Sequence, residues 1–361
     1  MTAAAATPAA GPTASAIFHL HPLRRCNLAC AHCYSDSAPH AAGLLSFEQA
    51  AGAIRQAAAW GYTQLAISGG EPLLYPWLAD VVALASDCGM RTALVTNGLL
   101  VPHRGNLDIL RQVGTVAVSV DGLGTAHDAL RRRPRAFAGV LRSLGLLADA
   151  GIGFHIICGV SGENLDDVDE LAALACGRGA AALQLHPISA AGRARTTMAD
   201  AVLGPDDANL LYLAGTLLAA AYAGKMGVHT DLVHRNCVMA RPCTIYARTA
   251  RASDAGARPA DLLGVLVLEP DGTVNPVSFG FGPLYGLGNI LERPLGSMWE
   301  PWLGDGYRRL IQLGRGLLAD LAAQSGPSVF NPSDVLRLAS HRIGAALPRR
   351  RATQEAAMTP S

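Results

Sequence analysis

The sequence "RCNLACAHCYS", residues 25–35, places three cysteines, Cys26, Cys30 and Cys33, within eight residues. Three thiols cannot all pair with one another in disulfides. A structural zinc site usually takes four ligands in two spaced pairs, and no second Cys-x2-4-Cys pair occurs in the chain. A thioredoxin-like pair would not need Cys26. Three clustered thiolates suit three corners of a [4Fe–4S] cluster whose fourth iron is free for an outside ligand.

The composition argues against a disulfide scaffold and against a nucleic-acid-binding face. The chain has 361 residues, of which half are apolar and 16% charged, and its formal net charge is +1. A nucleic-acid partner would call for a basic face. The basic run Arg349–Arg351 lies near the C-terminus, where we expect a solvated tail. Eight cysteines are too few for a disulfide framework in a chain of this size.

The chain shows no signal for export or for a membrane partner. Its N-terminus lacks a basic segment followed by an apolar one, and no apolar run approaches the length of a transmembrane helix. We therefore expect a cytoplasmic protein. About sixteen residues precede the first predicted strand, so we expect no leader-peptide recognition domain ahead of it.

Apolar, β-branched runs alternate with helical patterns through the first half of the chain. This alternation predicts βαβ units and a parallel sheet, which is an α/β fold. The pattern alone does not separate an open doubly wound sheet from a barrel or partial barrel. The predicted strands lie within residues 16–23, 63–72, 91–98, 115–122, 153–160 and 181–188, and the predicted helices span residues 46–60, 77–86, 107–112, 137–150 and 164–176.

Polar and glycine residues gather where these strands end. They occur in "SGGEP" (68–72), "TNG" (96–98), "SVDG" (119–122) and "HP" (186–187). Both an open parallel sheet and a barrel bind ligands at the carboxyl ends of their strands. The candidate site residues are therefore expected along one rim.

The pattern changes after about residue 200. A helical stretch at residues 206–224 is followed by a loop that contains cysteine and histidine. Residues 264–277, "GVLVLEPDGTVNPV", read as strand, Asp-Gly turn and strand, which predicts a β-hairpin. We predict a small C-terminal α+β subdomain here.

The CxxxCxxC spacing, the "SGGEP" motif and the six-strand alternation together resemble the radical SAM superfamily. The resemblance covers about residues 17–188 and implies a partial (β/α)6 TIM-type barrel. It implies that Cys26, Cys30 and Cys33 hold one [4Fe–4S] cluster. The open iron of that cluster would chelate the amino and carboxylate groups of S-adenosylmethionine (SAM).

The resemblance also implies which residues surround SAM. Taken alone, the Gly-Gly, Asn-Gly and Asp-Gly dipeptides are ordinary turn chemistry, and the run Arg131–Arg135 is typical of a solvated helix start. In the family, the corresponding positions contact the adenine, the amino group, the ribose and the carboxylate of SAM. The residues so implied are His32, Ser68, Gly69, Gly70, Glu71, Asn97, Ser119, Asp121 and Arg131, with Val160 and the backbone around Leu185 and His186 beside the adenine.

The C-terminal half resembles the SPASM and twitch extensions of the same superfamily, in a degenerate form. Cys243 matches the cysteine that precedes the hairpin, but Val277 stands where a later cysteine ligates an auxiliary cluster. Cys237 and Cys243, with His229 or His234, could still hold a metal, yet we expect the auxiliary cluster to be lost. The expected organisation is a disordered tail (1–15), a radical SAM core (16–200), a SPASM/twitch-like subdomain (201–310), and a helical, then disordered, end (311–361).

The function that the resemblance implies is reductive cleavage of SAM to a 5′-deoxyadenosyl radical. That radical would abstract hydrogen from a peptide or a small molecule in natural-product or cofactor maturation, and a flavodoxin or ferredoxin would supply the electron. The alternative is a non-catalytic iron–sulfur or zinc protein that acts as a sensor or scaffold. Modification of RNA is disfavoured by the near-neutral charge.

Overall fold

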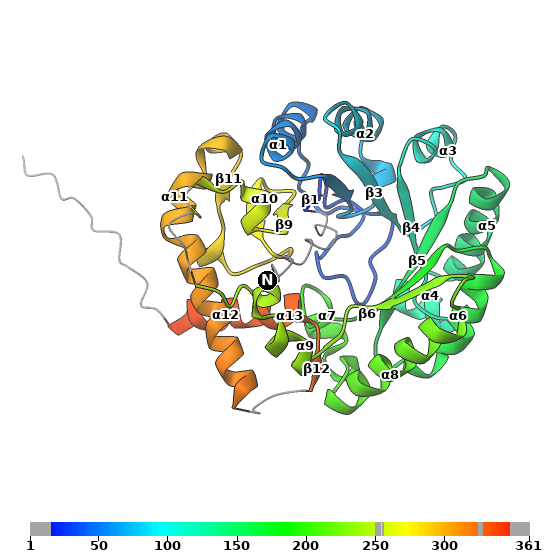
Figure 1. Cartoon of the computed structure of the whole chain (residues 1–361). Coiled ribbons are helices and arrows are strands. Elements are labelled where there is room, and N and C mark those ends of the chain that lie inside the picture. The colour runs from blue at the N-terminus through cyan, green and yellow to red at the C-terminus, as the bar shows by residue number, and fades with distance from the viewer. Residues whose placement is uncertain (1–15, 250–253, 255, 324–327, 347–361) are drawn as a thin grey trace, which may run out of the picture.

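A parallel, barrel-like sheet organises the molecule (Figure 1). The computed structural model describes residues 16–249, 254, 256–323 and 328–346, so the predicted tails at residues 1–15 and 347–361 lie outside the described residues. Within this part, ten strands form one sheet in the order β11-β10-β9-β1-β2-β3-β4-β5-β6-β7. Its parallel strands are β1 (Ile17–Leu20), β2 (Gln64–Ile67), β3 (Arg91–Thr96), β4 (Thr115–Ser119), β5 (Phe154–Val160), β6 (Ala182–Pro187), β7 (Gly227–Thr230) and β9 (Val265–Leu268).

Helices connect the parallel strands and form an outer layer around them, as Figure 1 shows. The predicted α/β partial barrel is therefore confirmed. An additional helix, α4, which the sequence pattern did not reveal, lies between β4 and α5. The helices of this layer are α1 (Phe47–Ala59), α2 (Leu78–Asp87), α3 (Asn106–Leu110), α4 (Gly124–Arg131), α5 (Ala136–Asp149), α6 (Val168–Gly177) and α8 (Pro205–Ala221).

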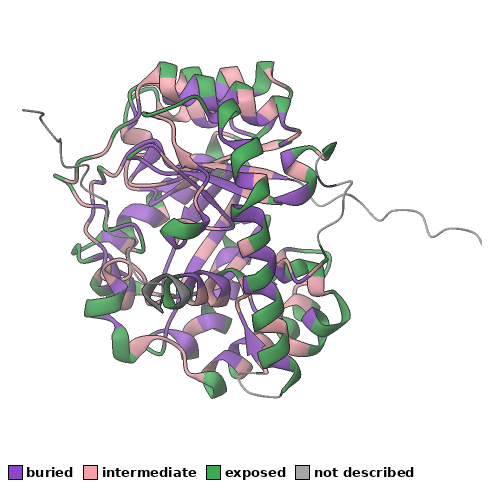
Figure 2. Cartoon of the chain, turned by 90° about the vertical axis from the view of Figure 1, so that its left-hand side faces the viewer, coloured by how far each residue is buried: buried purple, intermediate pink, exposed green. Residues whose placement is uncertain are grey.

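Burial alternates along the strands because each has one side against the helices and one toward the barrel interior. On β1, Phe18 and Leu20 are fully buried, whereas Ile17 and His19 are partly exposed. The same alternation runs through all seven residues of β5. Figure 2 shows buried residues concentrated in the central strands and exposed ones on the outer helices. The apolar core thus lies between sheet and helices, which leaves the inward-facing positions free for polar residues.

The first helix illustrates how local sequence positions the layer. Ser46 and Gln49 form a capping box, in which each side chain accepts a hydrogen bond from the backbone N–H of the other residue. The alanine-rich face of α1 packs against the sheet, and Gly61, at φ +91°, ends the segment in the left-handed region. The short side chains allow α1 to lie close to the strands beneath it.

Two strands extend the parallel sheet beyond the six that were predicted. β7, "GVHT", is short and mixes glycine with polar residues, so it carries little strand signal. The predicted hairpin is confirmed as antiparallel β9 and β10 (Thr273–Pro276), followed by β11 (Gly288–Asn289). However, β9 also pairs in parallel with β1, with Ile17 opposite Val265. The hairpin therefore continues the core sheet, and the division at residues 200 and 310 remains a prediction.

The open side of the sheet, between β7 and β11, is spanned by C-terminal elements. From α13, Arg337 donates to Ser189 Oγ after β6 (2.9 Å), and Ser340 Oγ accepts from Gly282 N after β10 (2.8 Å). The elements of this region are α7 (Ala194–Thr197), β8 (Val233–His234), α9 (Arg235–Ala240), α10 (Pro259–Leu262), α11 (Trp299–Gly304), α12 (Gly306–Ala322), β12 (Val329–Phe330) and α13 (Pro332–Ala346). Among the described residues, no helix has the length and apolar character needed to cross a bilayer.

Because β9 pairs with β1, we expect Leu266→Ala to destabilise the whole barrel. Leu266 is fully buried, so the substitution should lower the free energy of unfolding by about 3 kcal/mol. Denaturant unfolding followed by circular dichroism and by tryptophan fluorescence measures this. Leu217→Ala, at a position 70% exposed on α8, is the matched control and should change the value by less than about 0.5 kcal/mol. Two separate transitions in Leu266→Ala, with the first half unaffected, would contradict the shared sheet.

Candidate functional site

The three clustered cysteines lie on the loop between β1 and α1, at the carboxyl end of the first strand. Cys26 and Cys30 are buried, and Cys33 is partly exposed. The loop folds back on itself, since Cys26 N donates to Ala38 O (3.1 Å) and Ser37 N donates to Cys33 Sγ (3.2 Å). We call residues 23–38 the cysteine loop.

The "SGGEP" segment packs directly against the backbone of the cysteine loop. Gly70 N donates to Leu23 O (2.9 Å) and Glu71 N donates to Arg25 O (3.0 Å). A Cβ at Gly70 would stand 2.0 Å from Arg25 O, and one at Gly69, where φ is +115°, would stand 2.7 Å from Leu23 O. The glycine pair therefore permits a close approach of two backbones. This contact between two backbones was not visible in the sequence, where the resemblance implied only that the glycine pair lies beside SAM.

Glu71 ties the ends of β2 and β3 together. Its fully buried carboxylate accepts hydrogen bonds from Thr96 Oγ1 (2.8 Å), Asn97 N (2.9 Å) and Leu73 N (3.1 Å). Burial raises the pKa of Glu71, although these hydrogen bonds partly oppose the shift. Both carboxylate oxygens therefore have protein partners, and a contact of Glu71 with the amino group of SAM remains a prediction.

Arg131, Asp121 and His32 converge beside Cys30. Arg131 Nη2 lies 2.6 Å from Asp121 Oδ2, and their side chains are only 9% and 2% exposed. His32 Nε2 lies 3.2 Å from the same oxygen, and Arg131 Nη1 lies 3.8 Å from Cys30 Sγ. Arg131 is the last residue of helix α4, and its side chain is buried in this ion pair. It is therefore not part of a solvated helix start, which was the other interpretation of the sequence. Three residues implied by the resemblance thus form one charged network with a cysteine thiol.

The position of Asp121 is fixed by neighbouring strands as well as by these charges. Gly159 N, on β5, donates to Asp121 Oδ1 (2.9 Å), and Asn164 Nδ2 donates to Asp121 O (3.1 Å). Burial alone would raise the pKa of Asp121, but the charges of Arg131 and then His32 outweigh it and leave the pKa lowered. Asp121 is therefore a carboxylate at neutral pH.

Burial disfavours the thiolate forms that a metal cluster needs. It raises the pKa of Cys26 to about 12 and also raises that of Cys30, where the charge of Arg131 opposes the shift. Since metals and clusters bind thiolates, loading the site must release protons. Arg131 favours that loss at Cys30 by placing a positive charge beside the sulfur.

A second contact holds the cysteine loop from the side of β6. Arg193 donates from Nη1 to Cys30 O (2.7 Å) and from Nη2 to Ser37 O (2.9 Å), while Arg193 N donates to Cys33 O (2.9 Å). Gly192, at φ +50°, would bring a Cβ within 2.3 Å of Tyr34 O. Sequence reasoning missed both residues, because a lone Gly-Arg pair after a strand carries no motif.

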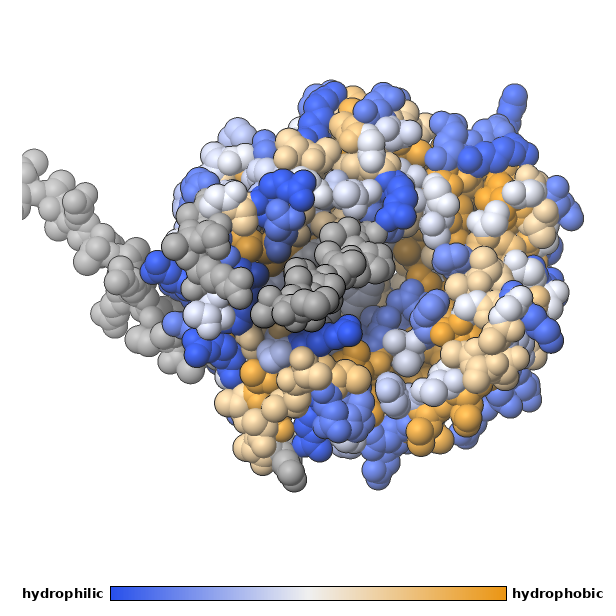
Figure 3. All heavy atoms as spheres, in the orientation of Figure 1, coloured by the Kyte–Doolittle hydropathy of each residue, from blue (hydrophilic) through white to orange (hydrophobic). Residues whose placement is uncertain are grey.

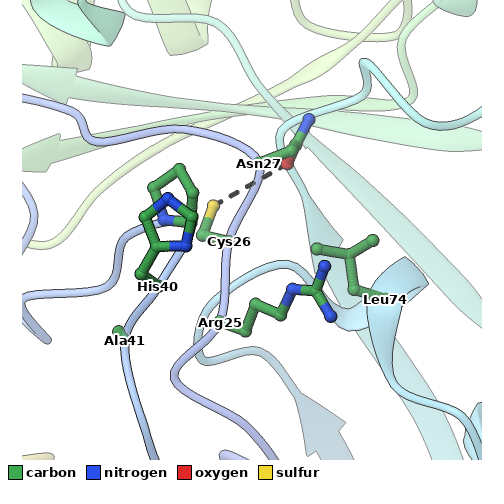
Figure 4. Close-up of a pocket in the computed structure, with 7 residues that line it drawn as sticks. Arg25, Cys26, Asn27, His40, Ala41 and Leu74 are labelled. Carbon is green, nitrogen blue, oxygen red and sulfur yellow. Dashed lines mark hydrogen bonds between the residues drawn. The ribbon is translucent and has the colours of Figure 1, made fainter.

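Asn97 contacts the cysteine loop from the end of β3. Its Nδ2 donates to Asn27 Oδ1 (2.7 Å) and lies 3.8 Å from Cys26 Sγ. Figure 4 shows Cys26 and Asn27 in a cavity of ≈410 Å³, with Arg25, His40 and Leu74 around it. The cavity brings solvent close to one thiol of the loop from its outer side, where Arg25 and His40 are exposed.

Inside the barrel, polar side chains gather next to Tyr34 of the cysteine loop. Ser68 Oγ lies 2.8 Å from His19 Nε2 and 3.3 Å from His21 Nε2, and 3.5 Å from the hydroxyl of Tyr34. Burial lowers the pKa of His19 to about 4 and that of His21 well below 6.5, with the neighbouring His19 adding to the second shift. Both histidines are therefore neutral at physiological pH. Figure 3 shows hydrophilic and hydrophobic residues together along the visible part of the recess on this face.

A histidine–aspartate pair lies at the carboxyl ends of β6 and β7. His186 Nδ1, at the end of β6, lies 2.5 Å from Asp231 Oδ2, just after β7. Gln184 Nε2 donates to both oxygens of Asp231 (2.9 and 3.0 Å). The His186 side chain is 46% exposed, and its Nε2 has no partner within the described residues. His186 on β6 is paired in register with Gly159 on the neighbouring strand β5. The backbone N–H of Gly159 is the group that donates to Asp121.

The remaining predicted residues lie apart from this network or make weaker contacts. Ser119 ends β4 and is partly buried. Cys237 and Cys243 are exposed on and after α9. Val277, which stands where the family's extensions have a cysteine, is buried at φ +69°, a backbone conformation that β-branched residues rarely adopt.

The chemistry of the donor set fits a [4Fe–4S] cluster with SAM beside it. Within the residues described, no group of three His, Cys, Asp or Glu side chains is arranged to hold a single metal ion. A cube binds each thiolate through a different iron, so its ligands need not converge on one point. Buried polar atoms without a hydrogen-bond partner include His32 Nδ1, Arg131 Nε and His21 Nδ1, beside or near the loop. Such atoms suit a site that takes a polar ligand.

Comparison with known proteins identifies the core of the chain. Residues 20–175 match the model of the radical SAM superfamily. The chain is 35% identical over 173 residues to the AdoMet-dependent heme synthase of Methanosarcina barkeri. The aligned region covers 46% of this chain and 49% of that relative. It is 30% identical over 175 residues to the antilisterial bacteriocin subtilosin biosynthesis protein AlbA of Bacillus subtilis. Here the aligned region covers 47% of this chain and 39% of that relative. The chain thus matches about half the length of these curated relatives, or less.

The fold is also shared with solved structures. SuiB of Streptococcus suis bound to S-adenosylmethionine superposes with a TM-score of 0.62 over 81% of this chain and 67% of that chain, at 15% sequence identity. This likeness shows the fold alone. The radical SAM family uses a [4Fe–4S] cluster and SAM, and the donor set described above fits both.

We expect Gly70→Ala to displace the cysteine loop, because its Cβ would overlap Arg25 O. The free energy of unfolding should fall by about 3 kcal/mol, and iron bound after anaerobic reconstitution should fall with it. Denaturant unfolding and iron analysis measure the two effects. Gly145→Ala, within α5 and with no atom within 4 Å of the added carbon, is the control and should be neutral or slightly stabilising. Equal behaviour of the two variants would contradict the packing argument.

The charge of Asp231 should set the protonation of His186. Burial would lower the pKa of His186, but the hydrogen bond and charge of Asp231, assisted by Asp334 and Asp121, raise it above 6.5. We expect Asp231→Asn to lower this pKa, measured by histidine side-chain NMR titration, while Asp108→Asn, in an exposed pair with Arg111, leaves it unchanged.

The sign of the linked stability follows from the raised pKa. The contribution of the pair to the free energy of unfolding is fully present below pH 6.5 and is lost as the pH rises through the pKa of His186. The stability difference between the natural protein and Asp231→Asn should therefore narrow as the pH rises. A difference that widens over this range would contradict the assignment.

Proposed function

We propose that this chain, which carries a radical SAM domain at residues 20–175, is an enzyme that reductively cleaves SAM to abstract hydrogen from a peptide or small-molecule substrate in natural-product or cofactor maturation. The observation that carries the proposal is the network of Arg131, Asp121 and His32 beside Cys30. It joins three of the residues that the sequence implied for SAM to one of the three thiols implied for the cluster.

The cysteine loop would hold the cluster through Cys26, Cys30 and Cys33. When bound, the cluster and SAM supply one-electron cleavage of a carbon–sulfur bond and, from it, hydrogen abstraction from an unactivated carbon. The protein supplies binding, orientation and exclusion of solvent. Two of the three thiols are already buried, and the loop is held in place by Gly70 on one side and Arg193 on the other.

The charged network would orient SAM and balance the charge of the site. Arg131 is paired by Asp121 yet lies near Cys30, so it offsets negative charge that builds up on the thiolates. Because the ion pair is buried, its electrostatic effect is stronger than that of a surface pair. Following the resemblance, we assign His32 to the adenine and Asp121 to the ribose or carboxylate of SAM.

The His186–Asp231 pair would serve the substrate. Gln184 orients Asp231, which in turn holds His186 Nδ1 and leaves Nε2 facing an accessible space at the rim. This is the arrangement of a positioned proton donor or acceptor. His186 would hold a proton at Nε2 toward an oxygen or nitrogen of the substrate, next to the carbon that loses hydrogen.

The relatives support both substrate classes. The heme synthase of M. barkeri favours a small molecule, whereas the bacteriocin subtilosin biosynthesis protein of B. subtilis favours a peptide. Incubating the reconstituted enzyme with either class and following substrate-dependent formation of 5′-deoxyadenosine separates the two. A flavodoxin or ferredoxin is the expected electron donor.

We expect anaerobic reconstitution to load about four irons per chain and reduction in the presence of SAM to yield 5′-deoxyadenosine. Cys30→Ser should abolish product formation and lower bound iron, because a hydroxyl does not replace a thiolate toward iron. Cys88→Ser, at a partly buried cysteine of the helical layer, is the control and should retain both. Iron analysis and chromatography of the products measure the outcome. Binding of zinc without cleavage of SAM would instead support the sensor or scaffold alternative.

A further inference from the structure

Three exposed arginines follow Arg131 in the loop between α4 and α5. Arg132, Arg133 and Arg135 are all exposed, whereas Arg131 is buried. Within the described residues, the guanidinium groups of these three have no ion pair and no hydrogen bond. We call residues 132–135 the arginine loop, and Figure 1 shows α4 and α5 on the side of the barrel away from α11 and α12.

The backbone of the arginine loop is held in an uncommon shape. Arg132 and Arg135 have φ values of +52° and +63°, in the left-handed region that favours glycine. The carboxylate of Asp128 fixes this shape by accepting from Arg135 N (2.5 Å) and from Phe137 N (2.7 Å). Such conformations persist where the surroundings enforce them, and they concentrate at functional segments.

The end of helix α4, which leads directly into the arginine loop, makes two contacts with the cysteine loop. Ala31 N, between Cys30 and Cys33, donates to Leu130 O (2.8 Å). Arg131 Nη1 then reaches Cys30 Sγ (3.8 Å). A protein docked on residues 132–135 would therefore sit a few residues from a thiol that the proposed function assigns to the cluster.

We propose that the arginine loop is the docking surface for a small acidic electron carrier of the flavodoxin or ferredoxin class. The proposal rests on the proposed function, because only a redox centre at Cys30 needs such a partner. The reduced carrier would supply one electron to the cluster that Cys26, Cys30 and Cys33 would hold, and this transfer would form or break no bond. The net charge of the chain is only +1, so three unpaired cations within four residues are a local concentration of charge. Such patches speed encounter with a partner of opposite sign.

The test compares two variants that lose the same charge. The first replaces Arg132, Arg133 and Arg135 with glutamine. The control makes the same change at Arg241, Arg308 and Arg315, which are also exposed and which lie on or near α9 and α12. Arg133→Gln alone, at a residue with ordinary φ, serves if the triple variant does not fold by circular dichroism.

Binding of flavodoxin to the full chain without its cluster is the first measurement. At low salt, we expect the arginine-loop variant to bind about tenfold more weakly than the natural protein, and the control to bind within about twofold of it. Raising the ionic strength should remove most of the difference, because salt screens exposed charges. Equal binding by all three proteins would overturn the proposal. Binding of total tRNA is measured in the same way. If the arginine-loop variant loses tRNA binding while its flavodoxin binding is unchanged, the proposal is also overturned, because the surface would then bind nucleic acid.

The second measurement is the rate of 5′-deoxyadenosine formation by the loaded enzyme with two reductants. With reduced flavodoxin, the arginine-loop variant should be about tenfold slower than the natural protein, whereas with dithionite the rates should agree within about twofold. An equal loss with both reductants would show that the loop acts on the cluster or the fold, and would overturn the proposal. If the natural protein yields no product with either reductant, the proposed function fails, and the binding measurement still decides whether the surface exists.

Discussion

The ion pair between Arg131 and Asp121 is the interaction on which the site depends. Burying two charges is costly and is offset only when each has further partners. The further partners of Asp121 are Gly159 N and His32, and the further partner of Arg131 is Cys30 Sγ. The pair thereby joins the end of β4, helix α4, strand β5 and the cysteine loop. Loss of either partner would leave a buried charge, at a cost of about 3–5 kcal/mol.

The cysteine loop is positioned by backbone contacts that leave little room for movement. Gly70 meets it from the end of β2, and Gly192 meets it from the loop after β6. Because parallel strands bring their carboxyl ends to one rim, the thiols, the charged network and the His186–Asp231 pair share that rim. The C-terminal helix α13 then spans the open side of the sheet and contributes Asp334 to the surroundings of His186. Cluster, SAM and substrate are thus all assigned to one face of the barrel.

Much of the fold could be predicted because each of the first six strands is a buried apolar run. Strand β7 could not be predicted, because "GVHT" is short and half polar. The pairing of β9 with β1 could not be predicted either, because no local sequence pattern indicates it. The thiols, Glu71 and Asp121 stood in recognisable motifs, whereas Arg131 was indicated only by resemblance. Arg193 and Asp231 were missed because each is a single residue after a strand, and its role comes from contacts with segments more than forty residues away.

We infer that the cysteine loop holds a cluster that binds SAM beside the Arg131–Asp121 pair. Low-temperature EPR spectroscopy of the reconstituted, reduced protein, recorded with and without SAM, tests it most directly. We expect the signal of a reduced [4Fe–4S] cluster whose line shape changes when SAM is added, because SAM would bind its open iron. A cluster signal that SAM leaves unchanged, or a protein that takes up zinc and shows no such signal, would contradict it.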